Sequence, residues 1–238
     1  MQTLSKNSLK YSVNYISLFL IMLLFFGFSN GEKKHLVHAP AIIKKTSLYE
    51  RLCLSDLDLK QDVFEKALKG LNSLIKKDEL CNSHLLSIID FSQSENLKRL
   101  YIIDIKKGEV LFNTYVAHGR NSGEEFAKSF SNKVNSYKSS LGFYITGNSY
   151  EGKNGLSLQL KGVENGINNF AEKRSIVMHG ASYVSEPFIK ENGHLGRSLG
   201  CPAVPLEFND AIINLLKEGS CLFIYYPDLN YLKKSKLI

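Results

Sequence analysis

The chain has 238 residues, of which 44% are hydrophobic, and it carries 30 Lys and Arg against 23 Asp and Glu, a formal net charge of +7. This length suits one domain with a substantial core, or one domain with a small helical extension. The basic balance favours anionic surroundings such as an acidic polymer or a lipid surface. Nucleic acid is not an expected partner, because the lysines are scattered and no Arg-rich or aromatic-interleaved motif is present.

The N-terminal segment has the pattern of a secretory signal. Lys6 and Lys10 precede an almost wholly apolar run at residues 15–28, and small and polar residues follow at 29–31. The run is shorter than the ~20 residues that span a bilayer. We therefore predict a signal peptide over residues 1–29 and an exported protein of the periplasm or cell envelope. The alternative is an uncleaved anchor, which would be the protein's only expected contact with a membrane.

The next stretch divides into a tether and a helical segment. Residues 30–47 mix Lys, His, Pro and small apolar residues without a period, which predicts a tether. Residues 48–96 are predicted to form a helical N-terminal segment, in which Asp58 and Gln61 are spaced as a capping pair. Four apolar side chains then recur every three to four residues, which is typical of an amphipathic helix. These are Phe64, Leu68, Leu71 and Ile75. A shorter element is expected within residues 81–91.

From Arg99 the sequence changes to β-branched and aromatic runs separated by turn residues, which predicts strands. The first two runs flank a short polar loop, the pattern of a β-hairpin. The runs lie at residues 100–105, 110–117, 142–146, 156–160, 175–178 and 221–226, and helical spacing is found at 208–216. We predict a mainly β, antiparallel domain with few helices over residues 97–228, followed by a C-terminal tail at 229–238.

The four cysteines are given different roles. In an oxidising compartment paired cysteines tend to form disulfides, and Cys53 with Cys81 is the pair that we expect to do so. Cys221 lies in an apolar run, which predicts an inert thiol in a buried strand. Cys201 is left as the free cysteine.

Cys201 and His179 are the candidate nucleophile and base. Cys201 follows a glycine, which can hold it on a tight turn with its sulfur exposed. Its thiol needs a base, since an ordinary thiol with a pKa of about 8.5 is mostly protonated at neutral pH. His179, twenty-two residues earlier, is the best-placed base in the sequence. The alternatives are a buried small hydrophobe for the cysteine and a satisfied core residue for the histidine.

Neither a metal nor a cofactor is expected. A structural zinc site usually has close-set ligand pairs such as C-x-x-C, and the chain has none. His118, His179, His194 and Cys201 could converge in space, but their spacing gives no reason to expect it. The chain also lacks a G-x-G-x-x-G run and a P-loop, so nucleotide chemistry has no motif to support it.

The candidate pair lies in two motifs, His179-Gly180 and Ser198-Leu-Gly-Cys201. In this respect the chain resembles the murein L,D-transpeptidase catalytic-domain family, the YkuD-like cysteine transpeptidases. One branch of that family is similar over roughly residues 50–226. The shared phrases are Val116-Ala-His-Gly119, Phe130-Ser-Asn132, Ser139-Ser-Leu-Gly-Phe143, Tyr150-Glu-Gly-Lys-Asn-Gly155, Val177-Met-His-Gly-Ala181 and Gly196-Arg-Ser-Leu-Gly-Cys-Pro202. The resemblance implies an antiparallel β-sandwich or barrel-like catalytic domain.

Two positions depart from the broader family. Many relatives carry Arg or Asn two residues after the nucleophile, where this chain has Ala203, and another common form has His two residues before it, where this chain has Leu199. We hypothesise that Arg197 supplies the missing cationic contact to a substrate carboxylate. A solvated loop arginine is the alternative.

The resemblance implies acyl transfer on peptidoglycan stem peptides. The Cys201 thiolate would attack the carbonyl of the third residue of a tetrapeptide stem and expel the terminal D-alanine, which leaves a thioester. An amine of a neighbouring stem would resolve the thioester and form a 3→3 crosslink, while His179 takes and returns protons. The carbonyl of Gly180 or Ala181 is expected to orient the histidine.

The remaining site residues have more general roles. The N–H groups of Gly200 and Cys201 are candidates for an oxyanion hole, and Ser198 is a candidate for substrate contact. His118 either lines the same cleft or is a hydrogen-bonded loop histidine. Alternatives to the transpeptidase are a carboxypeptidase or endopeptidase that hydrolyses the same bonds, and an inactive wall-binding module. The protein is expected to be a monomer.

Overall fold

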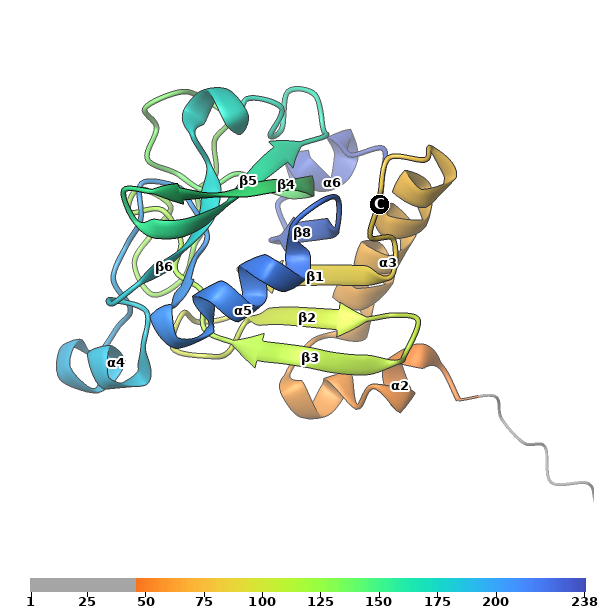
Figure 1. The fold of residues 1–238 in the computed structure, drawn as a ribbon, viewed down its shortest axis with the longest axis horizontal. Coiled ribbons are helices and arrows are strands. Elements are labelled where there is room, and N and C mark those ends of the chain that lie inside the picture. The colour runs from red at the N-terminus through yellow and green to blue at the C-terminus, as the bar shows by residue number, and fades with distance from the viewer. Residues whose placement is uncertain (1–45) are drawn as a thin grey trace, which may run out of the picture. The chain divides into compact units, whose positions relative to one another are not determined.

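One eight-stranded sheet organises residues 46–238, the part of the chain that the computed structural model describes. Residues 1–45, which hold the predicted signal peptide and nearly all of the predicted tether, lie outside this part. The strands lie in the order β3-β2-β1-β8-β4-β5-β6-β7 (Figure 1). Their bounds are β1 Leu85–Asp90, β2 Leu100–Asp104, β3 Glu109–Thr114, β4 Gly142–Gly152, β5 Gly155–Gly162, β6 Val177–Ala181, β7 Ala203–Pro205 and β8 Cys221–Tyr225.

The two edge strands approach each other, so the sheet is nearly closed. Ala117, which follows β3, pairs with Ala203 of β7, and its N–H donates to the Ala203 carbonyl at 2.9 Å. The helices are short apart from α3 and α5. They are α2 Leu48–Arg51, the 3₁₀ helix η1 Leu54–Leu57, α3 Gln61–Lys76, the 3₁₀ helix η2 Glu172–Arg174, α4 Glu186–Asn192, α5 Leu206–Leu216 and α6 Leu229–Lys234. The expected mainly β, barrel-like fold with few helices is confirmed.

The sheet is mixed rather than purely antiparallel. β1 pairs with β8, and β6 pairs with β7, in parallel, while the other five pairings are antiparallel. Parallel neighbours need a long crossover connection, and for β6 and β7 this connection is residues 182–202, which include α4. The predicted hairpin is present as β2 and β3, which pair from Leu100 with Thr114 to Asp104 with Glu109.

The predicted helical segment at 48–96 contains a central strand, and this part of the prediction is corrected. β1 lies between β2 and β8, and all six of its residues are buried. A short apolar run of this kind cannot be assigned to helix or strand by periodicity alone. Residues 45–238 form one compact unit, so the boundary between residues 96 and 97 does not separate two bodies.

The amphipathic helix is present as α3, although it begins differently from the prediction. Lys60 is its N-cap residue and makes no side-chain cap, whereas Asp58 ends the preceding 3₁₀ helix with a left-handed backbone at φ 61°. The buried face of α3 packs on β1 and β8. Gly70 of α3 lies against the Phe143 ring of β4, because a Cβ there would lie 2.0 Å from this ring. The Phe143 ring stacks on Phe223 of β8 with 4.2 Å between the ring centroids.

The cysteines and the C-terminal segment also differ in part from the predictions. Cys53 and Cys81 are both free and exposed, so the expected disulfide is not formed, whereas Cys221 is buried in β8 as predicted. The predicted tail at 229–238 is packed, since Tyr231 of α6 is buried and its hydroxyl donates to Glu164 at 3.3 Å. Within residues 46–238, no helix has the length and apolar character needed to cross a membrane.

Candidate active site

The loop that carries Cys201, residues 195–202, is called the cysteine loop, and it is folded around the Ser198 hydroxyl. This hydroxyl accepts from the Gly200 N–H at 3.0 Å and donates to the Cys201 carbonyl at 2.6 Å. Gly200 has φ +123°, and a Cβ there would lie 2.8 Å from the Lys138 carbonyl oxygen, so only glycine fits without strain. The hydrogen bonds of Ser198 therefore shape the turn before the thiol rather than being left for a ligand.

β6 places His179 beside this loop. β6 and β7 pair in parallel with His179 opposite Ala203, which is two residues after Cys201. His179 and Cys201 line the same cleft, which has a volume of about 610 Å³. The His179 Nδ1 lies 2.9 Å from the Gly180 carbonyl oxygen. A carbonyl only accepts, so Nδ1 carries the proton of the neutral ring and Nε2 is left as the basic atom.

The Cys201 thiol is half-buried, and its polar contacts are with the backbone at the start of β6. The Val177 N–H donates to Sγ at 3.5 Å, and the thiol donates to the Ser175 carbonyl at 3.6 Å. Burial raises the pKa of the Cys201 thiol, while the Val177 N–H and the nearby Arg174 guanidinium lower it. Since the net direction is upward, the resting thiol is protonated at neutral pH and needs a base to become nucleophilic.

Arg174, at the end of η2, is a cation of this cleft that the sequence analysis did not identify. Its guanidinium lines the cleft and donates four hydrogen bonds. The acceptors are Ser131 O at 2.6 Å, Ser136 Oγ at 3.2 Å, Ser140 Oγ and Lys138 O. It follows the exposed Lys173 directly, and no sequence signal distinguishes these two neighbouring cations.

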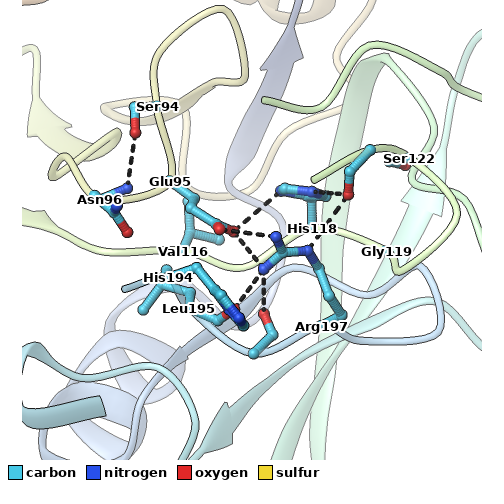
Figure 2. A network of polar contacts seen from close by, with 12 residues as sticks. Ser94, Glu95, Asn96, Val116, His118, Gly119, Ser122, His194, Leu195 and Arg197 are labelled. Carbon is cyan, nitrogen blue, oxygen red and sulfur yellow. Dashed lines mark hydrogen bonds and ion pairs between the residues drawn. The ribbon is translucent and has the colours of Figure 1, made fainter. Parts of the chain in front are cut away.

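The guanidinium of Arg197 is engaged by a buried carboxylate. Its Nη1 lies 2.5 Å from Glu95 Oε2, and its Nη2 donates to Glu95 Oε1 at 2.8 Å (Figure 2). Glu95, in the connection between β1 and β2, is fully buried. Arg197 also donates to the carbonyls of Leu195 and Gly196 within its own loop. The guanidinium is therefore neither solvated nor left for a substrate carboxylate, which corrects both expectations.

His118 lies in the same buried cluster and does not line the cleft of Cys201. Its Nδ1 lies 2.9 Å from Arg99 Nη2, and its Nε2 lies 3.0 Å from the Gly123 carbonyl. Figure 2 shows His118 beside Glu95 and Arg197. Burial and the Arg99 charge lower the pKa of His118 to about 3. The histidine is thus neutral, and it acts on the cysteine loop through its backbone, whose carbonyl accepts from the Ser198 N–H at 3.1 Å.

The N–H groups of Gly200 and Cys201, the two predicted oxyanion-hole donors, differ in their hydrogen bonding. The Gly200 N–H is bonded to Ser198, so it is not available to an oxyanion. The Cys201 N–H has no hydrogen-bond partner within residues 46–238, which leaves it as the stronger of the two predicted donors. Across the same residues, no group of three or more His, Cys, Asp or Glu side chains is arranged to hold a metal ion.

Residues 55–225 match the sequence profile of the L,D-transpeptidase catalytic domain, which covers most of the chain. The chain belongs to the L,D-transpeptidase catalytic-domain family. The family resemblance stated from the two motifs is thereby confirmed. No curated protein matches the sequence.

Several solved structures are similar to this L,D-transpeptidase-family chain at low sequence identity. An L,D-transpeptidase from Mycobacterium smegmatis is 10% identical, with a TM-score of 0.39, over 60% of this chain and 59% of the other. One from Mycobacterium tuberculosis H37Rv is 13% identical, with a TM-score of 0.36, over 60% and 58%. The helical cell shape determining protein Pgp2 from Campylobacter jejuni is 12% identical, with a TM-score of 0.38, over 67% and 54%. The chain spans somewhat more than half the length of each of them.

Proposed function

We propose that the protein is a peptidoglycan L,D-transpeptidase that forms its acyl-enzyme on Cys201. The observation that carries this proposal is that Cys201 and His179 line one cleft while the Gly180 carbonyl fixes the His179 tautomer. A nucleophile, a base and a group that orients the base are the parts that cysteine acyl transfer requires. Family membership supplies the substrate class, which is the stem peptides of peptidoglycan.

In the first half-reaction, Nε2 of His179 takes the thiol proton as Sγ attacks the carbonyl carbon of the third stem residue. Because burial raises the pKa of the thiol, the attack depends on this proton transfer to His179. The oxyanion develops next to the Cys201 N–H. Collapse of the tetrahedral intermediate breaks the L,D peptide bond, and His179 returns the proton to the departing D-alanine amine. A thioester on Cys201 remains.

In the second half-reaction, an amine of another stem attacks the thioester carbonyl. His179 removes the amine proton and returns it to the thiolate, which restores the resting enzyme and leaves a 3→3 crosslink. A second cavity of about 570 Å³ adjoins the catalytic cleft and shares Ala181, Ser182 and Leu206 with it. This cavity offers space for a second stem peptide beside the thioester. It therefore favours an amine acceptor over water, and hence transpeptidation over hydrolysis.

The substrate polymer lies outside the cytoplasm, so we also propose that the protein acts there after export, in the periplasm or cell envelope. Lys153 adds a positive charge to the lining of the cleft, which suits the carboxylates of stem peptides. The net charge of +7 on the whole chain acts in the same direction.

The decisive experiment incubates the purified protein with tetrapeptide muropeptides, with and without an acceptor amine, and analyses the products by mass. A transpeptidase yields crosslinked dimers and free D-alanine. Tripeptides alone would identify a hydrolase, and no product would indicate a binding module.

Two cysteine variants assign the nucleophile. Cys201→Ala should abolish turnover and thioester formation, whereas Cys221→Ala should retain both because Cys221 is buried in β8. Labelling of the reduced wild-type protein with a carbapenem should place an adduct on Cys201. Turnover by Cys201→Ala would refute the assignment.

A further inference from the structure

The two arginines that line the catalytic cleft differ in what balances their charge. Arg197 is paired with the buried Glu95 carboxylate. Arg174 is half-buried, and each of its hydrogen bonds ends on a neutral oxygen, either a carbonyl or a serine hydroxyl. Within residues 46–238 it has no ion pair with a carboxylate. A half-buried cation without an anionic partner is costly unless an anion forms beside it.

The charge of Arg174 lies against the turn that presents the thiol. A Cβ on Gly200 would lie 3.2 Å from Arg174 Nη2, so the guanidinium is in contact with the residue before Cys201. The next residue, Ser175, accepts the hydrogen bond of the Cys201 thiol at 3.6 Å. The two chain segments are therefore in contact at this point, and the Arg174 charge is close enough to the Cys201 thiol to lower its pKa.

Arg174 is also held rigidly. Both of its terminal nitrogens are committed to two acceptors each, on the segment from Ser131 to Ser140. A guanidinium bound in this way has no free fork for a bidentate contact with a substrate carboxylate. It acts through its charge, and because it is already fixed in place it needs no reorganisation when the anion forms.

We propose that Arg174 is the fixed counter-charge of the Cys201 thiolate, a positioning and electrostatic residue that favours ionisation of the nucleophile. This inference rests on the proposed function, in which Cys201 is the attacking group. In the step concerned, the Cys201 S–H bond breaks, its proton passes to Nε2 of His179, and the electron pair stays on sulfur beside Arg174. Arg174 exchanges no proton.

The test measures the rate at which iodoacetamide alkylates Cys201 between pH 5 and pH 10, by mass spectrometry of the Cys201 peptide. The neutral reagent reports thiolate formation without requiring turnover. In Arg174→Gln the apparent pKa of Cys201 should rise by about one unit, the low end of the effect of an adjacent opposite charge, and alkylation at pH 7 should slow about tenfold. Arg174→Lys keeps the charge and should stay within about threefold of wild type.

The matched control is Lys173→Gln, which removes one positive charge from the neighbouring residue. The Lys173 ammonium lies 5.9 Å from the Phe170 ring centroid and does not line the cleft, so this variant should alkylate at the wild-type rate. The exposed Cys53 and Cys81 act as internal references in every sample, because their rates should not change while the fold is intact.

Three results would overturn the proposal. The first is an unchanged Cys201 profile in a folded Arg174→Gln, and the second is a loss in Arg174→Lys as large as that in Arg174→Gln. The third is that Arg174→Gln slows alkylation by anionic iodoacetate but not by neutral iodoacetamide, which would make Arg174 a binding group for anionic ligands. Absence of muropeptide turnover with an intact alkylation result would instead refute the proposed function and leave the role of Arg174 standing.

Discussion

The buried neutral histidine gives a quantitative prediction about stability and pH. Arg99 can only donate, so His118 accepts from it through an unprotonated Nδ1 and donates to the Gly123 carbonyl through Nε2. Protonation would break the first of these bonds. It would also add a third positive charge beside Arg99 and Arg197, faced by the single carboxylate of Glu95. The folded protein therefore resists protonation of this ring.

The magnitude follows from the two pKa values. The pKa of His118 is lowered from 6.5 to about 3 in the folded protein, so between these values the unfolded chain binds about one proton more. The free energy of unfolding then falls as the pH falls, by about 1.4 kcal/mol per pH unit well below 6.5. Between pH 7 and pH 5 this single group should remove about 2 kcal/mol of stability.

The assay is urea unfolding of the wild type and His118→Gln at pH 7, 6 and 5. Glutamine does not titrate, so the variant should lose about 2 kcal/mol less than the wild type between pH 7 and pH 5, whatever its absolute stability. The carboxylates change the free energy of unfolding equally in both proteins, so their contribution cancels when the variant is compared with the wild type. His84→Gln is the control, since His84 is exposed. A His118→Gln profile parallel to that of the wild type would refute the reasoning.

Two further substitutions test the elements that hold the cysteine loop. Glu95→Gln leaves the Arg197 guanidinium without its buried partner and should lower the free energy of unfolding in urea by about 3 kcal/mol. The control is Asp62→Asn, which removes one partner of an exposed ion pair and should cost less than about 0.5 kcal/mol. Equal costs would contradict a buried ion pair. Gly200→Ala places a Cβ 2.8 Å from a backbone carbonyl oxygen and should reduce the rate of thioester formation at least about tenfold. In the control Gly193→Ala, the added Cβ has no atom within 4 Å, so the acylation rate should not change. A wild-type rate in Gly200→Ala would show that the turn does not position the thiol.

The strands and the family motif could be predicted because each is encoded locally. The alternating apolar and turn residues between β2 and β5 follow from the pleat of a sheet. The dependence of the thiol on a base follows from its chemistry. β1 is the exception, because all six of its residues are buried and its sequence has no polar face to mark the strand. A strand in the middle of a sheet is specified by the neighbours that cover it, and these lie far away in the chain.

The electrostatic roles of the arginines could not be predicted, because they depend on long-range partners. Arg197 lies inside the motif and attracts a functional interpretation, yet Glu95, about a hundred residues earlier, engages its charge. Arg174 lies outside the motif, and its acceptors come from residues 131–140. The identity of a cation in a sequence says nothing about which carboxylate neutralises it.

The separation of His179 and Cys201 in the sequence has a structural reason. Because β6 and β7 run in parallel, the chain must leave His179, cross over and re-enter the sheet before it can pair again. The crossover brings Cys201 back immediately ahead of the strand that pairs with β6, where the Val177 N–H contacts its sulfur. The same crossover carries Arg197 into contact with Glu95, so the ion pair fixes the far side of the loop while the sheet fixes the near side. The backbone on both sides of the loop therefore fixes the position of Cys201, the proposed nucleophile.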